Sequence, residues 1–520
     1  MPTPNPFLLM IGCFAIVGCS QSVKTQESST EKSSYYTEKY RPQYHFTPEA
    51  NWMNDPNGMV NYEGEYHLFY QYYPDSTVWG PMHWGHAVST DLVSWEHLPI
   101  ALYPDSLGLI FSGSAVIDWN NTSGFGTDEE PPMIAIFTHH LMEGEKAGRT
   151  DFQYQSIAYS LDKGRNWTKY EGNPVLPNQG IKDFRDPKVF WHEPTQKWIM
   201  TLAVFDHVEF YSSADFKSWD KLSDFGLNEG RREVLWECPD LFPMQFDGKT
   251  KWVLLVSVNP GGPNGGSSTQ YFIGDFDGTD FKNDNSPETI LWLDYGTDNY
   301  AGVTWSDIPE EDGRRLFIGW MSNWLYAQIV PTEKWRSAMT IPRELSLSNT
   351  ADGYIIKSKP ILELNQLRSK TMSLEQTAVE RSLKIETDSL DINKAELAVT
   401  FSGINSDEFG IRLSNGSENV TIGFDAIRNK YFIDRTQAGN SGFHQEFAQR
   451  QWGNRLVDDT VELRIFVDAS SIELFADDGA TVLTVNIFPL EPYRLLEVLA
   501  KNGSVNLDEF ILWELNSIWR

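Results

Sequence analysis

The chain has 520 residues, 40% of them hydrophobic and 13% aromatic, so it is long enough for two domains with sizeable cores. Its 42 basic and 72 acidic side chains give a formal net charge of −30. This balance argues against nucleic acid or an anionic lipid surface as the main partner, because phosphate binding requires a basic surface. The 19 Trp and 21 Tyr residues are more informative, since aromatic faces bind sugar rings as well as fill cores. The composition therefore favours a protein that handles a neutral ligand.

The N-terminal segment is typical of an export signal rather than of a folded domain. Phe7 to Val17 is apolar, too short to span a bilayer but long enough for the hydrophobic part of a secretory signal. The sequence Ile16-Val17-Gly18-Cys19 resembles a bacterial lipobox, with Cys19 as the lipidated residue of the mature protein; a plain cleaved signal is the alternative. We expect a lipoprotein signal peptide at 1–19, a disordered tether at 20–35, and membrane contact only through the lipid anchor.

The cysteine content limits the covalent and metal chemistry. The chain has three cysteines, and Cys13 and Cys19 belong to the export segment. Only Cys238 is left for the folded part, so no internal disulfide can form there. No cluster of Cys and His suggests a metal, and we expect none.

From residue 36 onward the pattern predicts short β-strands almost throughout. Val60 to Gln71 is typical of two strands around a turn at Glu63-Gly64. Lys197 to Phe205, Lys251 to Val258 and Arg315 to Trp320 are rich in β-branched and aromatic residues, which favour strands. No long segment has a convincing helical period, so we expect an all-β fold.

A weak internal repeat runs through this region. Ser89 to Trp95 and Ser213 to Trp219 share the pattern Ser-x-Asp-x-x-Ser-Trp, and Ser160 to Trp167 has the same phrase with one insertion. Gly274 to Phe281 is a degenerate copy. Recurrence every several dozen residues in an all-β region favours the blades of a β-propeller, with unrelated Asp-to-Trp turns as the alternative.

The character of the chain changes near residue 345. Ile361 to Leu367 has apolar residues three and four apart and is the one plausible helix, which we interpret as part of a connector. Leu463 to Val467 and Ser471 to Phe475 predict a hairpin, and Asp477-Asp478-Gly479 predicts a further turn. About 140 residues of short strands with regular turns fit a β-sandwich.

These patterns predict two folded domains. We expect a catalytic β-propeller at 36–345, a linker at 346–375 and a β-sandwich at 376–520. The predicted sandwich region contains no group of carboxylates in motifs that suggest catalysis, so we expect it to be structural or to add ligand contacts.

Three carboxylates in the propeller region each stand beside a proline. They are Asp55 in Asn51 to Gly58, Asp186 before Pro187, and Glu237 two residues before Pro239. Proline fixes one turn position, and Asn-Gly tolerates positive φ, so each stretch predicts a tight turn near an aromatic-rich strand. The three could meet in one cleft; solvated turns are the alternative for each taken alone.

Two carboxyl groups are what hydrolysis of a glycosidic bond requires. Asp55 is the candidate nucleophile, because it is short, fixed in a turn and next to amides. Glu237 is the candidate acid, since partial burial beside Trp236 would raise its pKa. Asp186 should stay ionised beside Arg185 and hold sugar hydroxyls. These residues alone leave retention and inversion open.

The motifs around these residues resemble those of glycoside hydrolase family 32, the β-fructosidases that include invertases, inulinases and levanases. The likeness runs from about Tyr40 to the C-terminus. It rests on five stretches in order: Trp52 to Gly58, Phe111 to Ser114, Phe184 to Lys188, Trp236 to Asp240, and Trp335 to Leu345.

The resemblance implies a five-bladed β-propeller followed by a β-sandwich, with a funnel-shaped site at the propeller axis. It implies retention, with a covalent fructosyl intermediate on Asp55, Glu237 as acid and then base, and Asp186 on the fructose hydroxyls. No metal or organic cofactor is required. The residues implied to line the terminal-fructose pocket are Asn54, Asn57, Gln71, Trp79, Phe111, Ser112, Arg185 and Trp324. As alternatives, Phe111 and Trp324 could be core aromatics, Gln71 a strand cap and Trp79 a loop anchor.

Within the family, Glu63 to Gln71 and Arg464 to Asp468 are most similar to bacterial levanases and exo-inulinases. The resemblance therefore implies exo-hydrolysis of terminal β-linked fructose from fructans, with sucrose as a second substrate. The nearer alternatives are an invertase, an endo-fructanase or a fructosyltransferase on the same scaffold. The farther one is a non-catalytic glycan-binding protein, which should have lost Asp55 or Glu237.

Overall fold

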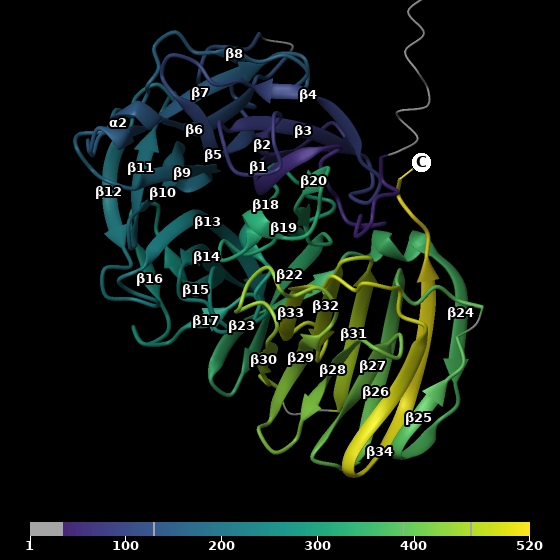
Figure 1. Ribbon diagram of the computed structural model, residues 1–520. Helices are drawn as coiled ribbons and strands as arrows, with labels where there is room; N and C mark the ends of the chain where they lie inside the picture. The colour runs from purple at the N-terminus through teal and green to yellow at the C-terminus, as the bar shows by residue number, and fades with distance from the viewer. Residues whose placement is uncertain (1–34, 128–129, 388, 458–459, 520) are drawn as a thin grey trace, which may run out of the picture. The chain divides into compact units, whose positions relative to one another are not determined.

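A computed structural model describes residues 35–127, 130–387, 389–457 and 460–519 (Figure 1). The expected signal peptide at 1–19, with Cys19, and the tether up to residue 34 lie outside these ranges. Residues 36–520 belong to one compact unit. No helix among the described residues is both long and apolar enough to cross a membrane.

Five sheets of four or five strands follow one another along the chain (Figure 1). The first holds β1 (Asn51–Tyr62), β2 (Glu65–Tyr73), β3 (His83–Ser89), β4 (Glu96–Leu102) and β20 (Trp335–Arg336). The second holds β5 (Leu109–Ile117), β6 (Met133–His140), β7 (Gln153–Ser160) and β8 (Thr168–Lys169). The third holds β9 (Phe184–His192), β10 (Lys197–Val204), β11 (His207–Ser213) and β12 (Asp220–Phe225).

The other two sheets complete the set. The fourth holds β13 (Leu235–Phe246), β14 (Lys249–Asn259), β15 (Ser268–Phe276), β16 (Phe281–Asn283) and β17 (Leu291–Trp292). The fifth holds β18 (Tyr300–Thr304), β19 (Arg315–Met321), β21 (Ala338–Met339), β22 (Arg343–Thr350) and β23 (Gly353–Pro360).

The first strands of the sheets form a closed ring. β1 contacts β5, β5 contacts β9, β9 contacts β13, β13 contacts β18, and β18 returns to β1. The late strand β20 also pairs in parallel with β1, at Asn51 with Trp335, so a segment from the end of the ring joins its beginning. This arrangement confirms the five-bladed propeller.

The sequence repeat marks one turn in four of the five blades. In the first four sheets, an aspartate lies between the third and fourth strands, at positions 91, 162, 215 and 277. Asp91 accepts hydrogen bonds from the backbone N–H groups of Val93 and Ser94, and Asp277 does the same with Thr279 and Asp280. The repeat is therefore a set of side-chain-capped turns that connects the outer strands.

Residues after 367 form one eleven-stranded, sandwich-like sheet (Figure 1). Its strands are β24 (Arg368–Leu374), β25 (Thr377–Ile385), β26 (Ala395–Asn405), β27 (Glu408–Ser414), β28 (Asn419–Asp425), β29 (Lys430–Gln437), β30 (Arg450–Asn454), β31 (Val461–Asp468), β32 (Ser471–Ala476), β33 (Thr481–Asn486) and β34 (Leu495–Leu515). The long β34 pairs with β24, β25, β26 and β27. The predicted hairpin is β31 and β32, so this expectation is confirmed.

The segment expected as a linker, 346–375, contains more structure than a connector. Most of β22 and all of β23 lie in it and complete the fifth sheet. The expected helix is the 3-10 helix η3 (Leu362–Leu367), which is followed by β24. The short helices α2 (Met142–Lys146), η1 (Glu193–Thr195) and η2 (Ala327–Ile329) were not predicted, since each has too few residues to display a period.

A buried ion network joins the propeller to the C-terminal sheet. Arg343 on β22 donates to Asp294 at 3.0 Å and also binds Glu473 on β32. His45 lies between Asp468 and Glu473, with N–O distances of 2.7 and 2.9 Å. All five side chains are fully buried. The network therefore links residues of the propeller region, Arg343 and Asp294, to Glu473 of the C-terminal sheet.

Candidate active site

A β-bulge interrupts each of the five innermost strands. The bulges fall between Met53 and Pro56 in β1, between Ile110 and Gly113 in β5, and opposite Leu202 in β9. In β13 the bulge begins at Glu237, and in β18 it begins at Tyr300. A bulge redirects side chains and leaves residues outside the ladder.

The three expected turns around the carboxylates are therefore wrong as turns. Asp55, Asp186 and Glu237 all lie within strands, at or beside these bulges. Proline has no N–H to donate, which suits a residue that a bulge leaves unpaired as well as it suits a turn. The backbone is left-handed at Asp186, with φ of 65°, and at Cys238, with φ of 46°. Few non-glycine residues adopt this conformation, and those that do are concentrated at functional sites.

The redirected side chains line a cavity of about 220 Å³. It is bounded by Asn54, Asp55, Gln71, Trp79, Phe111, Ser112, His140, Glu145, Phe152, Gln153, Asp183, Arg185, Asp186, Glu237 and Trp324. All three expected carboxylates and seven of the eight residues expected around a sugar are in this set. Asp55 and Glu237, which are 182 positions apart in the sequence, thus meet in one place.

Asp55 is held by two side-chain donors. Ser112 Oγ donates to Oδ2 at 2.7 Å, and Asn54 Nδ2 donates to Oδ1 at 2.9 Å. Asn54 is fixed in turn, since its Oδ1 accepts the indole N–H of Trp52 at 2.7 Å. Burial and the nearby Glu237 carboxylate raise the pKa of Asp55 above its usual value. Asp55 is therefore rigidly oriented in a water-poor site.

Glu237 is held from two sides. Arg185 donates to Oε1 through Nε at 3.3 Å and Nη2 at 3.1 Å. The hydroxyl of Tyr300 donates to Oε2. Arg185 also binds Asp183 at 2.8 Å, which keeps the guanidinium in place. Both oxygens of Glu237 are thus fixed in orientation.

Asp186 differs from the expectation of a simple ionised partner of Arg185. Its Oδ2 accepts the backbone N–H of Cys238 at 3.1 Å, and Arg185 Nε lies 3.9 Å away. Burial outweighs the attraction of Arg185 and raises the pKa of Asp186 to about 7. The carboxylates of Glu237 and Asp55 act in the same direction as burial, because three acidic groups share a small volume.

Cys238, the one cysteine of the described chain, lies between two of the carboxylates. Its Sγ is 3.8 Å from Asp55 Oδ2 and 3.8 Å from Asp186 Oδ2. Burial and these carboxylates raise the pKa of the thiol well above its usual range. The sulfur therefore remains a neutral thiol that separates the two acids.

Asn57 corrects one expectation, since it does not line the cavity. Its side chain is fully buried behind β1, where Nδ2 donates to the carbonyl oxygen of Asp55 at 2.5 Å. Its Oδ1 accepts the backbone N–H of Gly113 at 3.0 Å. Asn57 therefore ties the bulge of β1 to that of β5 and supports the site from behind.

The aromatic and amide residues of the wall are arranged for contact with a ligand. Phe111 stacks on His140 at 4.2 Å between ring centres, and the Trp79 ring meets Phe111 edge-on at 6.1 Å. Gln71 is almost fully buried, and its Nε2 has no hydrogen-bond partner among the described residues. An unpaired donor at the cavity wall is available to a ligand oxygen.

Sequence reasoning missed six residues of the site. They are His140, Glu145, Phe152, Gln153, Asp183 and Tyr300. Asp183 stands just before the Phe184-Arg185-Asp186 motif, which is a signal that could have identified it. The others come from β6, α2, β7 and β18 or, for Phe152, from the residue just before β7, where no local pattern of chemistry-bearing residues marks them.

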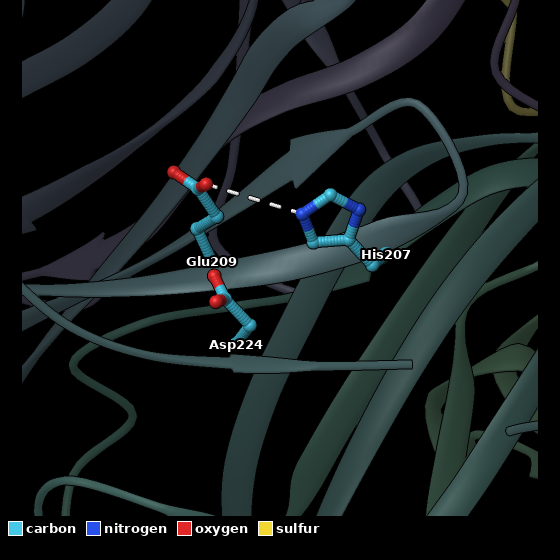
Figure 2. A group of neighbouring side chains, drawn as sticks. All are labelled: His207, Glu209 and Asp224. Carbon is cyan, nitrogen blue, oxygen red and sulfur yellow. Dashed lines mark ion pairs between the residues drawn. The ribbon is translucent and has the colours of Figure 1, made fainter. Parts of the chain in front are cut away.

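A separate cluster has the composition of a metal site. His207, Glu209 and Asp224 on β11 and β12 lie close enough to share one ion (Figure 2). However, the ammonium of Lys221 is 2.6 Å from both Glu209 and Asp224, and Tyr211 donates its hydroxyl to Glu209. A lysine thus already occupies the position of a cation, and the cluster is a salt bridge within one blade.

The chain matches two family models over most of its length. "Glycosyl hydrolases family 32 N-terminal domain" matches residues 45–360, and "Glycosyl hydrolases family 32 C terminal" matches residues 363–514. A levanase of Bacillus subtilis is 52% identical over 498 residues, 94% of this chain and 72% of that protein. An extracellular exo-inulinase of Aspergillus niger is 39% identical, over 93% of this chain and 96% of that protein.

Comparison with solved structures leads to the same family. The exo-inulinase from Aspergillus awamori superimposes with a TM-score of 0.85 at 35% identity, covering 93% of this chain and 100% of that one. A β-fructofuranosidase from Schwanniomyces occidentalis complexed with fructosyl-erythritol gives 0.84 at 33% identity, covering 93% and 99%. The chain belongs to glycosyl hydrolase family 32 and is a glycosidase.

Proposed function

We propose that the protein is an exo-acting β-fructosidase that removes terminal β-D-fructofuranosyl residues from fructans and also cleaves sucrose. The observation that carries this proposal is the set of three carboxylates in one small cavity, with Glu237 held by Arg185 and Tyr300. The names of the relatives, a levanase and exo-inulinases, support fructans as the substrate class.

The inner end of the cavity supports exo-cleavage. Below the carboxylates, Lys188 Nζ donates to the carbonyl oxygen of Thr304 at 2.5 Å and lies 3.5 Å from Asp240. These three residues are buried. We infer that they close the inner end of the cavity, so that a chain end can enter it but the middle of a polymer cannot pass through it.

The proposed mechanism is a double displacement with retention. Asp55 attacks the anomeric carbon while Glu237 gives its proton to the leaving oxygen, which forms a covalent fructosyl ester and releases the shortened chain. Glu237 then takes a proton from water, which attacks the same carbon and frees Asp55. Asp186 in its ionised form accepts hydrogen bonds from fructose hydroxyls. Each of these roles needs a fixed carboxylate, and the contacts of Asp55 and Glu237 provide that.

The terminal sugar contacts that we propose come from the cavity wall. Gln71 Nε2 is a free donor, and Asn54, Ser112 and Arg185 add polar groups beside the carboxylates. Trp79, Phe111 and Trp324 supply apolar faces. No metal or cofactor takes part in this scheme.

We further propose export and anchoring through a lipid on Cys19, based on the sequence of the N-terminal segment. Relatives with the name extracellular exo-inulinase support export. Membrane fractionation of the full chain beside its Cys19→Ser variant tests the anchor. Release of the variant alone from the membrane fraction supports lipidation, whereas equal distribution of both contradicts it.

The decisive experiment for the activity is a time course of products from levan, inulin and sucrose. Fructose as the sole early product from a polymer supports the proposal, and the relative rates identify the preferred linkage. Early oligosaccharides would instead mean endo-cleavage, and activity on sucrose alone would mean an invertase. Binding without any release from the three substrates would contradict catalysis.

A further inference from the structure

A second cavity, of about 300 Å³, lies in the propeller and shares no residue with the first. We call it the distal cavity. It is built from later residues of the same innermost strands: Ile117 of β5, Lys188 of β9, Asp240 of β13 and Thr304 of β18. The first cavity uses earlier residues of β5, β9 and β13. The distal cavity therefore lies farther along the ring axis, beyond the buried contact of Lys188 with Thr304.

An unusually exposed tryptophan stands at this cavity. The side chain of Trp119 is 59% exposed, yet its position is fixed. Its Nε1 donates to Asp307 Oδ1 at 2.9 Å, and its ring meets Tyr62 edge-on at 5.8 Å. Asp307 is itself held by the backbone N–H of Ile117 at 3.0 Å. A large aromatic face that is both rigid and open to solvent is a ready platform for a ligand.

The polar groups of the distal cavity have unused bonding capacity. Asp240 is fully buried, and its Oδ2 accepts from the backbone and side chain of Thr304 at 2.6 and 2.9 Å. Its Oδ1 has no partner among the residues that the structure describes. A buried carboxylate oxygen without a partner is rare and requires an explanation.

Arg315 adds unused donors to the same cavity. Its guanidinium lies over the ring of Phe242 at 4.8 Å, and it makes no hydrogen bond or ion pair with another described side chain. Arg315 and Lys188 balance Asp240 and Asp307 in charge. A charged ligand would disturb this balance, whereas a neutral ligand rich in hydroxyl groups accepts hydrogen bonds from Arg315 without changing it.

We propose that the distal cavity is a non-catalytic binding site for a neutral carbohydrate, in which a sugar ring rests on Trp119 and hydroxyl groups accept hydrogen bonds from Arg315. Trp191 and Trp252 also line the distal cavity with aromatic rings. Such a site would hold a polysaccharide chain on the enzyme while another chain end is cut. The inference rests on the proposed function only for the choice of fructan as the first probe.

The test is affinity electrophoresis of the full chain in native gels that contain levan, inulin or a neutral glucan. The Asp55→Asn variant serves as the parent, so that the polymer is not degraded. Replacing Trp119 by Ala in this parent should weaken retardation about tenfold, because the ring loses the apolar contact area. Trp119→Phe should restore most of the effect, since it keeps an aromatic face.

A matched control is Ile427→Ala, which removes an even more exposed apolar side chain at the turn between β28 and β29. It should leave retardation unchanged. Arg315→Gln should weaken binding as well, which separates a ligand site from a local effect at Trp119. Unchanged thermal unfolding of each variant shows that the fold is intact.

Active enzyme gives an independent readout. Trp119→Ala should raise KM for a fructan polymer severalfold and leave sucrose kinetics unchanged, because sucrose fits the first cavity alone. Retardation by a glucan but not by fructans would support the distal site and count against the proposed substrate. Retardation that Trp119→Ala and Arg315→Gln both leave unchanged, or no retardation of the parent by any of the three polymers, would overturn the inference.

Discussion

Arg185 donates twice to the same oxygen of Glu237, through Nε at 3.3 Å and through Nη2 at 3.1 Å. The other oxygen accepts the hydroxyl of Tyr300. The guanidinium is fixed by Asp183 on its far side. The proposed acid/base is thus oriented before substrate arrives, which removes the cost of ordering it during the reaction.

Replacing Arg185 by Gln should lower kcat/KM on fructan about 100-fold, because a preorganised charged donor is removed from the reacting group. Steady-state kinetics on levan and sucrose measure this loss. Arg185→Lys is the control, since it keeps the positive charge without the forked geometry, and it should retain part of the activity. A Gln variant with activity within threefold of wild type would show that Glu237 does not depend on this contact.

Asp55→Asn should abolish turnover, with a loss of at least about 10⁴-fold, because an amide cannot form the covalent intermediate. The fold should persist, since the amide retains the shape and a hydrogen bond from Ser112. The raised pKa of Asp55 reflects an unfavourable buried charge, so the variant should be at least as stable as wild type at neutral pH. Rates together with thermal unfolding check both statements, and wild-type turnover in a folded variant would refute the nucleophile assignment.

The fold could be predicted where its determinants are local. The capped turns at Asp91 and Asp277 are determined by residues adjacent in sequence, and the recurrence of this pattern predicted the propeller. The bulges at Asp55 and Asp186 could not be recognised, because a proline suits a turn and a bulge alike and only the pairing with the next strand distinguishes them. The strands of 346–360 were missed as part of the fifth sheet, because β22 joins that sheet only through the pairing of Arg343 to Leu345 with β19, and β23 joins it only through its pairing with β22.

In the site, too, residues marked by local motifs could be predicted, and residues placed by distant contacts could not. Asp55, Asp186 and Glu237 could be found because each stands in a compact motif, whereas Tyr300 binds Glu237 across 63 positions of sequence and no motif marks it. Asn57 does not line the cavity because its side chain binds Gly113 on β5, and this packing of β1 against β5 is not visible in the sequence. Burial is the largest influence on the pKa of Asp186 and raises it. The degree of burial cannot be predicted from the adjacent Arg185 in the sequence.

His45 predicts a pH dependence of stability. Burial lowers its pKa, but hydrogen bonds with Asp468 and Glu473 more than offset this and raise the pKa from 6.5 to about 9. Protonated His45 therefore stabilises the folded state; its contribution is complete below about pH 6.5 and is lost as the pH rises through about 9. The free energy of unfolding, measured in denaturant across this pH range, should fall as the pH rises. It should fall less steeply in His45→Gln. Parallel curves for the two proteins would contradict the assignment.

Glu473 should be the most sensitive position of the buried ion network. Its carboxylate accepts from His45 Nε2 at 2.9 Å and from the backbone N–H of Ile341 at 2.9 Å, and it also binds Arg343. Glu473→Gln keeps the shape but leaves two buried cations short of a partner, which should cost about 3–5 kcal/mol of unfolding free energy. Equilibrium unfolding in denaturant measures the loss.

Two comparisons make that prediction specific. Glu375→Gln removes an exposed carboxylate from the connection between β24 and β25 and should change the unfolding free energy by less than about 0.5 kcal/mol. Combining Glu473→Leu with Arg343→Met and Asp294→Asn removes all three linked charges, and this should recover part of the stability that Glu473→Gln loses, because His45 keeps Asp468 as its partner. If Glu473→Gln lost no more than Glu375→Gln, the network would not be what holds the C-terminal sheet to the propeller, and the apolar contacts around it would have to account for the joint.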